Sequence, residues 1–259
     1  MKKKPLQYLL IAAFLTINIQ LFNTVSAENP DVTDATETPQ SILEKSDEIR
    51  FPRESFQVDV SINTTASNQQ IETRKFRVLS KGNENSIVMT TEPASERGQA
   101  ILMRGRDLWI FMPSVSQPIR LSLSQRLTGQ VANGDLARAN FAGDYNPTLL
   151  RIDTIDGENY HVLELIGVDR SVTYHKVLLW VQQSNYWPYR AEFYSLSNRL
   201  LKTALYENFQ MLLGQKRPTR LVMEDALRQD EVSVLEYSTM ELRDLPDKVF
   251  TKNYLKRLE

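Results

Sequence analysis

The sequence of 259 residues contains no cysteine and only two histidines, and these absences exclude several kinds of site. Without cysteine there are no disulfide bonds, thiolate metal sites or cysteine nucleophiles, and no lipidated N-terminal cysteine of the bacterial lipoprotein type. His161 and His175 have no further ligands at metal-site spacing. The sequence also lacks a Gly-x-Ser-x-Gly elbow and a phosphate-binding glycine loop. We therefore predict no enzyme, no cofactor and no metal centre.

The sequence lacks an apolar run of the roughly 20 residues that a membrane span needs. Its N-terminus has three consecutive lysines from Lys2, a shorter apolar segment over Leu6–Phe22, and small residues before Glu28. This pattern predicts a secretory signal peptide over residues 1–27 with cleavage after Ala27, and an uncleaved anchor is the alternative. The mature chain is predicted to be soluble in the periplasm, and secretion from a cell with a single membrane is the alternative.

A strong excess of basic residues is also missing. Removal of residues 1–27 takes away three lysines and no acidic residue, which leaves 28 basic against 32 acidic residues and a net charge near −4. A nucleic-acid-binding protein would show a strongly basic face, so we predict no nucleic-acid partner. Residues 28–40 are polar and acidic and predict a flexible leader, and residues 41–259 have the length of one domain.

One helix is predicted before the strands begin. Pro39 is suited to a first helical position, and Ile42, Leu43 and Ile49 follow at helical spacing. The period changes to two from Ser55 onward, where Phe56, Val58, Val60 and Ile62 all fall on one face of a strand.

Similar alternation recurs along the chain and predicts about ten strands. Asp156-Gly157 is a strong hairpin-turn signal between two of them. A second helix is predicted near residues 250–258, where apolar residues recur at helical spacing. The fold class is therefore mostly β with a few helices, either an antiparallel barrel or a strongly curved open sheet.

The central hairpin over residues 100–112 has a clear predicted register. Gly105-Arg106 suits a two-residue turn with glycine first, which places Arg104 opposite Asp107 and Ile101 opposite Ile110. Both faces of this hairpin are more apolar than an exposed hairpin requires. The hairpin therefore lies either in an ordinary sandwich core or in a sheet that surrounds an apolar cavity.

The cavity interpretation requires lining residues from several strands. Methionine adapts its shape to varied chains, and four methionines are spread over the predicted strands. Ordinary core packing is the alternative explanation for all of them. The predicted ligand-binding residues are Phe56, Val58, Val60, Met89, Ile101, Met103, Leu108, Ile110, Met112 and Phe193.

The segment after the hairpin is predicted to leave the sheet and to cover one mouth of it. Pro113 and Pro118 end the strand, and Asp135 is placed to cap a short helix. Long connections of this kind are usually functional or mobile, although a plain surface loop is the alternative. The residues predicted to form the lid or to contact a partner are Arg120, Arg126 and Phe141, with Arg104 and Arg106 at the hairpin tip.

Two runs of the sequence carry a resemblance to a known family. Residues 80–129 resemble the signature region of the outer-membrane lipoprotein-sorting protein family, which has the LolA-like fold, and residues 180–203 resemble its later Trp and aromatic-Pro hairpin. The likeness extends over most of the chain from about Ser41. It is greatest to the branch found beside lipid exporters of the resistance-nodulation-division (RND) type. The resemblance implies an unclosed half-barrel with a helical lid over an apolar cavity that binds acyl chains.

Three functional hypotheses follow. The favoured one is a periplasmic carrier that binds acyl chains of lipids or lipoproteins for transfer toward the outer membrane, with an RND-type inner-membrane transporter as a partner. The second is an accessory or sensor subunit that binds a membrane transporter or a lipoprotein without carrying cargo. The third is a hydrolase with a site that no motif reveals.

Overall fold

The computed structural model describes residues 37–67, 69–138, 140–228 and 230–255. The predicted signal peptide, its cleavage site after Ala27 and most of the predicted leader lie outside these residues. Among the described helices, none combines the length and the apolar character needed to cross a membrane.

The first helix, α1 (Pro39–Arg50), confirms the predicted N-terminal helix. The side chain of Thr38 accepts a hydrogen bond from the Ser41 N–H at 3.1 Å, which caps the helix, and Pro39 occupies the first turn, where its missing N–H costs nothing. Ile42 and Leu43 are fully buried, so one face of α1 packs into the core.

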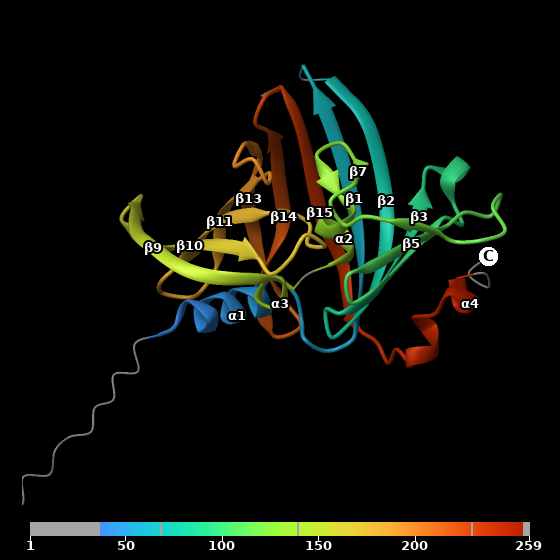
Figure 1. The fold of residues 1–259 in the computed structure, drawn as a ribbon, viewed down its shortest axis with the longest axis horizontal. Coiled ribbons are helices and arrows are strands. Elements are labelled where there is room, and N and C mark those ends of the chain that lie inside the picture. Colours follow the sequence, from blue (N-terminus) through green and yellow to red (C-terminus); the bar gives the residue numbers. More distant parts are fainter. Residues whose placement is uncertain (1–36, 68, 139, 229, 256–259) are drawn as a thin grey trace, which may run out of the picture. The chain divides into compact units, whose positions relative to one another are not determined.

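Within the described residues, thirteen antiparallel strands form one large sheet, in the order β6-β5-β4-β3-β2-β1-β15-β14-β13-β12-β11-β10-β9. The described residues show no pairing between the edge strands β6 and β9, so the sheet is not closed into a barrel (Figure 1). The strands are β1 (Phe56–Ala66), β2 (Gln69–Lys81), β3 (Asn85–Glu92), β4 (Ala100–Arg104), β5 (Asp107–Phe111), β6 (Ile119–Leu121), β9 (Tyr145–Ile155), β10 (Glu158–Gly167), β11 (Lys176–Gln182), β12 (Pro188–Tyr194), β13 (Leu200–Leu212), β14 (Gln215–Asp225) and β15 (Glu231–Leu242).

The central hairpin β4–β5 has the predicted register. Ile101 pairs with Ile110 and Arg104 with Asp107, and Gly105 adopts a positive φ of 56° in the turn. The prediction that the chain leaves the sheet directly after this hairpin is wrong, because Ile119–Leu121 returns to pair with β5 as the edge strand. The three residues after Pro118 are enough to form hydrogen bonds with β5 again.

One face of the sheet, here called the interior face, carries the main core. Its buried cluster draws on strands from β5 at one end to the first residue of β9, Tyr145, at the other, so the sheet curves around a shared interior. The interior also receives the lid segment, residues 122–144, which contains β7 (Arg126–Thr128), β8 (Val131–Ala132), α2 (Asn133–Ala137) and α3 (Phe141–Asp144). Leu123, Val131 and Leu136 of this segment are buried against the sheet.

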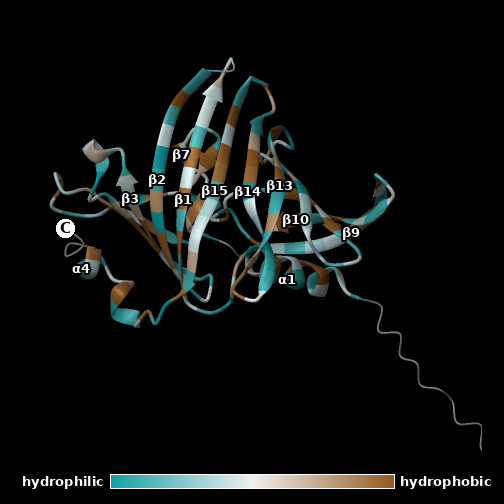
Figure 2. Ribbon diagram, turned by 180° about the vertical axis from the view of Figure 1, so that it is seen from behind, coloured by the Kyte–Doolittle hydropathy of each residue, from teal (hydrophilic) through white to brown (hydrophobic). Residues whose placement is uncertain are grey.

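The opposite face of the central hairpin is covered as well. Leu102 and Phe111 pack in a second buried cluster with Phe250 and Leu255, which belong to the C-terminal segment containing α4 (Lys252–Leu255). In this segment α4 contacts β4, and the view from behind shows it on the same side of the molecule as β3 (Figure 2). The predicted closing helix is confirmed over these four residues, and its burial explains why both faces of the hairpin are apolar.

Substitution of Leu255 by alanine tests this covering role. Leu255 is fully buried, so we expect its truncation to lower the free energy of unfolding by about 3 kcal/mol. Urea unfolding followed by tryptophan fluorescence measures the change. Leu227→Ala is the matched control, because Leu227 is 73% exposed and should cost less than about 0.5 kcal/mol. Equal stabilities of the two variants would contradict the assignment.

Candidate functional site

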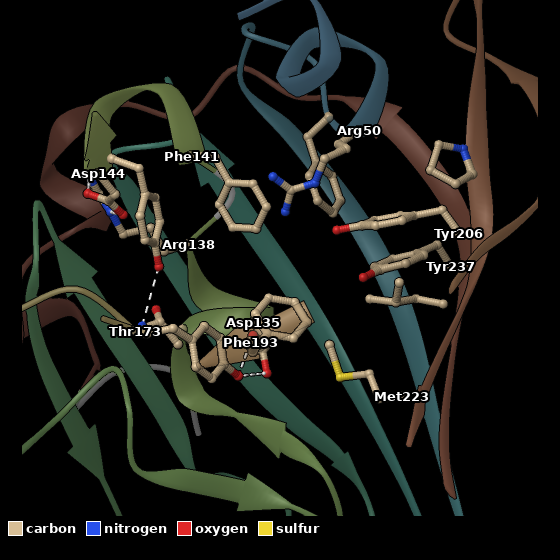
Figure 3. A pocket seen from close by; sticks show the side chains of 16 residues that line it. Arg50, Asp135, Arg138, Phe141, Asp144, Thr173, Phe193, Tyr206, Met223 and Tyr237 are labelled. Atoms are coloured by element: carbon tan, nitrogen blue, oxygen red, sulfur yellow. Dashed lines mark hydrogen bonds and ion pairs between the residues drawn. The ribbon is translucent and has the colours of Figure 1, made fainter. Parts of the chain in front are cut away.

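A small enclosed cavity lies between the interior face and a roof made by α1 and α3 (Figure 3). Phe193, Leu221 and Met223 line its apolar part, and Arg50, Tyr206 and Tyr237 line its polar part. Its volume is about 30 Å³, whereas cavities that accommodate benzene measure about 150 Å³. The interior is therefore closed, with room for a water-sized group but not for an acyl chain.

The structure gathers most of the residues predicted from sequence to bind ligand. Phe193 lines the cavity, and three β1 residues line a smaller void of about 10 Å³ that shares Phe51 and Tyr237 with it. The residues in the interior cluster are Phe56, Val58, Val60, Ile101, Met103, Leu108 and Phe193, with Ile110 partly buried against them. Whether they bind ligand stays a prediction.

Two predicted lining residues lie elsewhere. Met89 packs in the second cluster, on the opposite face of the sheet, with Leu102 and its neighbours. The reason is the register between β3 and β4, which pairs Val88 with Ile101 and Met89 with Ala100, so that Val88 shares the interior face. Met112 follows the end of β5 and is only partly buried.

The sequence did not predict the polar part of the cavity. Arg50 ends α1, Tyr206 lies in β13 and Tyr237 in β15, so three segments far apart in sequence supply it. The sequence signal for each was weak, since Tyr206 and Tyr237 alternate with apolar residues and fit an ordinary half-buried strand. No pattern of sequence spacing predicts that three residues from such distant segments lie together.

The guanidinium of Arg50 is the centre of the roof. Its Nη1 donates to Asp47 Oδ1 at 2.8 Å, and its Cζ lies 3.8 Å from the centroid of the Phe141 ring. The other oxygen of Asp47 accepts the Ala142 N–H at 2.7 Å. Burial raises the pKa of Asp47, and the neighbouring Arg50 opposes this rise. Asp47 and Arg50 thereby hold α3 against α1 over the cavity.

A second polar contact fixes α2 to the floor of the interior. Lys202 Nζ, on β13, donates to Asp135 Oδ2 at 2.7 Å, and the Tyr174 hydroxyl donates to the same oxygen at 2.7 Å. Burial lowers the pKa of Lys202, while burial and the charge of Asp135 raise the pKa of the Tyr174 phenol. Asp135, predicted to cap a helix from its start, lies in the third position of α2 and accepts the Ala132 N–H at 2.8 Å.

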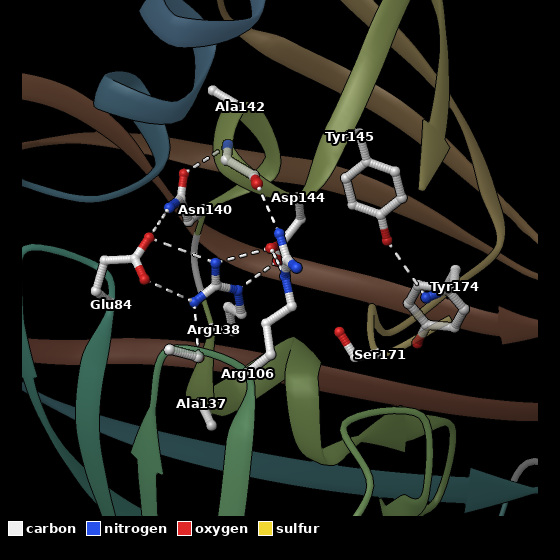
Figure 4. A network of polar contacts seen from close by, with 12 residues as sticks. Glu84, Arg106, Ala137, Arg138, Asn140, Ala142, Asp144, Tyr145, Ser171 and Tyr174 are labelled. Carbon is white, nitrogen blue, oxygen red and sulfur yellow. Dashed lines mark hydrogen bonds and ion pairs between the residues drawn. The ribbon is translucent and has the colours of Figure 1, made fainter. Parts of the chain in front are cut away.

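An ionic network joins the two ends of the unclosed sheet (Figure 4). Arg138 and Asp144 of the lid segment form a buried pair, with Nη2 and Oδ1 2.7 Å apart. Arg106, at the tip of the central hairpin, donates to Asp144 at 2.8 Å and to Asp169, after β10, at 2.9 Å. Arg106 is therefore half-buried and engaged within the fold, whereas Arg104 is exposed, and contact of these two arginines with a partner stays a prediction.

The predicted lid residues occupy different environments. Phe141 lies over Arg50 at the cavity, with its ring edge-on to Tyr145 at a centroid distance of 5.6 Å. Arg120 is exposed and pairs with Asp107, and Arg126 is exposed at 4.0 Å from Glu231. Only Phe141 of the three therefore meets the cavity, and partner contact by the two arginines stays a prediction.

The lid segment makes close contact with the sheet around it. A Cβ on Gly134 would lie 2.0 Å from Thr173 Oγ1, so a larger residue at Gly134 requires the Thr173 side chain to be moved or replaced. Ser86 Oγ donates to the Ala137 carbonyl at 2.7 Å, and the Gln130 N–H donates to Ser233 Oγ at 2.9 Å. These contacts hold the segment within the curved sheet.

Neither histidine belongs to a metal cluster. Within the part of the chain that the structure describes, no three potential metal-ligating side chains of histidine, cysteine, aspartate or glutamate gather at one place. His161 lies in β10, where burial lowers its pKa, and His175 is exposed just before β11.

The chain is similar to several known proteins. A protein-family model described as "Uncharacterized protein" matches residues 82–257. A LolA superfamily protein from Nitrosomonas europaea is 73% identical, with a TM-score of 0.81 over 84% of this chain and 99% of its own. No curated protein matches the chain.

Two more distant structures share the fold. A protein described as an outer membrane lipoprotein-sorting protein domain, from Vibrio parahaemolyticus, is 22% identical, with a TM-score of 0.73 over 85% of this chain and 98% of its own. A DUF1329 family protein from Desulfovibrio piger is 20% identical, with a TM-score of 0.72 over 84% of this chain and 99% of its own.

The ionic network can be tested by replacing Asp144 with asparagine. Arg138 would then keep its buried charge without its main partner, and we expect the free energy of unfolding to fall by about 3–5 kcal/mol. Asp169→Asn is the matched control, because this exposed carboxylate also accepts from Arg106 but should contribute less than about 1 kcal/mol. Denaturant unfolding of both variants makes the comparison, and similar losses would argue against a bridge centred on Asp144.

Proposed function

The chain belongs to the LolA superfamily, and from this premise we propose that it is a periplasmic carrier of acyl chains, held inside the curved sheet and passed toward the outer membrane. The structure from Vibrio parahaemolyticus, described as an outer membrane lipoprotein-sorting protein domain, has the same fold and favours this role. The signal peptide over residues 1–27, cleaved after Ala27, delivers the domain of residues 41–259 to the periplasm in this proposal. An RND-type transporter as the donor at the inner membrane stays a prediction.

The observation that supports the carrier most is the continuous apolar interior face. Its buried cluster runs across strands from β5 to the first residue of β9, with aliphatic and aromatic side chains throughout. Each buried methylene of a bound chain contributes about 0.8 kcal/mol, so one long acyl chain gains on the order of 10 kcal/mol before ordering costs. Such binding needs no catalytic group, and the proposal is for a protein without catalysis.

Because the enclosed cavity measures only about 30 Å³, cargo enters in this proposal when the lid segment moves. The segment is held by a mixture of apolar side chains and polar contacts. Its polar anchors include Asp135 with Lys202, Ala137 with Ser86, Ala142 with Asp47, and Asp144 with Arg106. Polar groups released by opening can hydrogen-bond to water, and the apolar surface released from the lid is then covered by the acyl chain.

Native mass spectrometry of the mature protein, purified from a periplasm without detergent, tests the carrier function directly. We expect a bound mass that solvent extraction identifies as a lipid or an acylated peptide. An apo mass that persists after incubation with phospholipid vesicles and with a synthetic acylated lipopeptide would overturn the proposal. Capture of a membrane complex by the lipid-free protein would then favour the accessory or sensor role.

A reversible lock tests whether the lid segment must move. The chain has no cysteine, so Gly134→Cys with Thr173→Cys introduces a single thiol pair. A Cβ at Gly134 lies 2.9 Å from Thr173 Cβ, and a small backbone shift reaches the roughly 3.5–4.5 Å of a disulfide. We expect the oxidised variant to bind no acyl chain and the reduced variant to recover binding. Equal binding in both states would show that cargo does not require this movement.

The interior face itself is tested by Ile110→Glu. Ile110 is only partly buried against the interior cluster, so the variant should fold, while a carboxylate on this face should lower acyl-chain affinity by about tenfold or more. Ile71→Glu, at a residue that is 61% exposed, is the matched control. Lipid uptake by both variants at the level of the unmodified protein would count against the interior face as the binding surface.

A further inference from the structure

Arg50 carries a buried hydrogen-bond donor that the described residues leave unused. Only 8% of the residue is exposed, and its Nη1 is engaged by Asp47. Its Nε has no acceptor among the described residues and is inaccessible to solvent. A buried charged donor without a partner is costly, so such a group is retained where something else supplies the acceptor. Arg50 lines the enclosed cavity, so an acceptor for this donor would lie in that cavity.

Two tyrosine hydroxyls converge on the same place. Tyr206 and Tyr237 project from neighbouring parts of the interior face, and their hydroxyls point into the cavity toward Arg50 (Figure 3). The Cζ of Arg50 lies 6.0 Å from the centroid of the Tyr206 ring. Burial raises the pKa of both phenols above the ordinary value, so each remains a neutral hydroxyl that can donate a hydrogen bond.

The acidic side chains near this site already have partners of their own. Asp135 is held by Lys202 and Tyr174, and Asp144 is held by Arg138 and Arg106. Asp47 engages Arg50 only through Nη1, which leaves the edge formed by Nε and Nη2. An arginine edge of this kind binds a carboxylate or a phosphate through two parallel hydrogen bonds.

Resting on the proposed carrier function, we infer that Arg50, Tyr206 and Tyr237 bind the anionic head group of the cargo, a carboxylate or phosphate attached to the acyl chain. The head group lies under α3 in this arrangement, and the chain extends over the apolar interior face past Phe193 and Met223. Phe141, which now covers the Arg50 guanidinium, moves with the lid segment when the head group enters. The preferred cargo is therefore an anionic amphiphile rather than a neutral one.

Three probes with the same 16-carbon chain test this preference: palmitate, hexadecyl phosphate and hexadecanol. Isothermal titration calorimetry of the mature protein, below micelle-forming concentrations, gives the three affinities. We expect at least one anionic probe to bind about tenfold or more tightly than hexadecanol, since charged hydrogen bonds exceed neutral ones in strength. Which anionic probe binds more tightly distinguishes a carboxylate head group from a phosphate.

Variants assign the preference to these residues. Tyr206→Phe and Tyr237→Phe remove one hydroxyl each without changing packing, and each should reduce the ratio of anionic to neutral affinity by roughly threefold to tenfold. Tyr160→Phe is the matched control, because Tyr160 is a buried tyrosine of a separate cluster with Val162 and Trp180, and it should leave the ratio unchanged. Arg50→Gln combined with Asp47→Asn removes both charges together and should abolish the preference.

The outcomes separate the two proposals. Equal binding of all three probes, or a preference that survives in the double variant, would overturn the head-group inference and leave the carrier function standing. If none of the three probes binds while native mass spectrometry finds a bound lipid, the head-group inference again fails alone. If no probe binds and the purified protein also takes up no lipid from vesicles or lipopeptide, the carrier function fails as well.

Discussion

The buried ion pair between Arg138 and Asp144, extended by Arg106, is the constraint on which the rest of the structure depends. The strands at the two ends of the sheet do not pair among the described residues, so hydrogen bonds between strands do not hold the curved sheet together there. Arg106 instead joins the tip of the central hairpin to Asp144 and Asp169. A buried pair of this kind adds little net stability over apolar packing, but it fixes one arrangement, because either charge alone would be costly. The bridge also borders the enclosed interior, because Arg138 and Asp144 both line the cavity.

The central hairpin is held from both sides, and this bears on the carrier function. Its interior face contributes Ile101, Met103 and Leu108 to the main core, and its other face is covered by the C-terminal segment around Phe250 and Leu255. A wall packed on both faces resists deformation. The lid segment differs, since its helices α2 and α3 are only five and four residues long and are held by side-chain contacts instead of by pairing between strands. Movement during cargo binding is therefore expected in the lid segment and not in the wall.

The interior combines an extensive apolar face with one concentrated polar corner. Apolar burial is roughly proportional to area and does not discriminate between chains, so an apolar face alone would accept many cargoes. The corner formed by Arg50, Tyr206 and Tyr237 is directional, because hydrogen bonds and charge require a matching group at a fixed place. In the proposed carrier, the apolar face supplies affinity and this corner supplies selectivity for a head group.

The sequence by itself determined the local structure well, because local structure depends on residues close together in the chain. Pro39 and the apolar spacing after it set the bounds of α1. Strict alternation placed every second residue from Phe56 to Ile62 on one face of β1, and Gly105-Arg106 fixed the register of the central hairpin. The tertiary structure alone decided which faces meet. Met89 was assigned to the wrong face because a connection containing a short helix separates β3 from β4, and alternation within one strand says nothing about register across such a connection. Arg50, Tyr206 and Tyr237 were missed for the same reason, since only the curvature of the sheet brings these distant residues to one cavity.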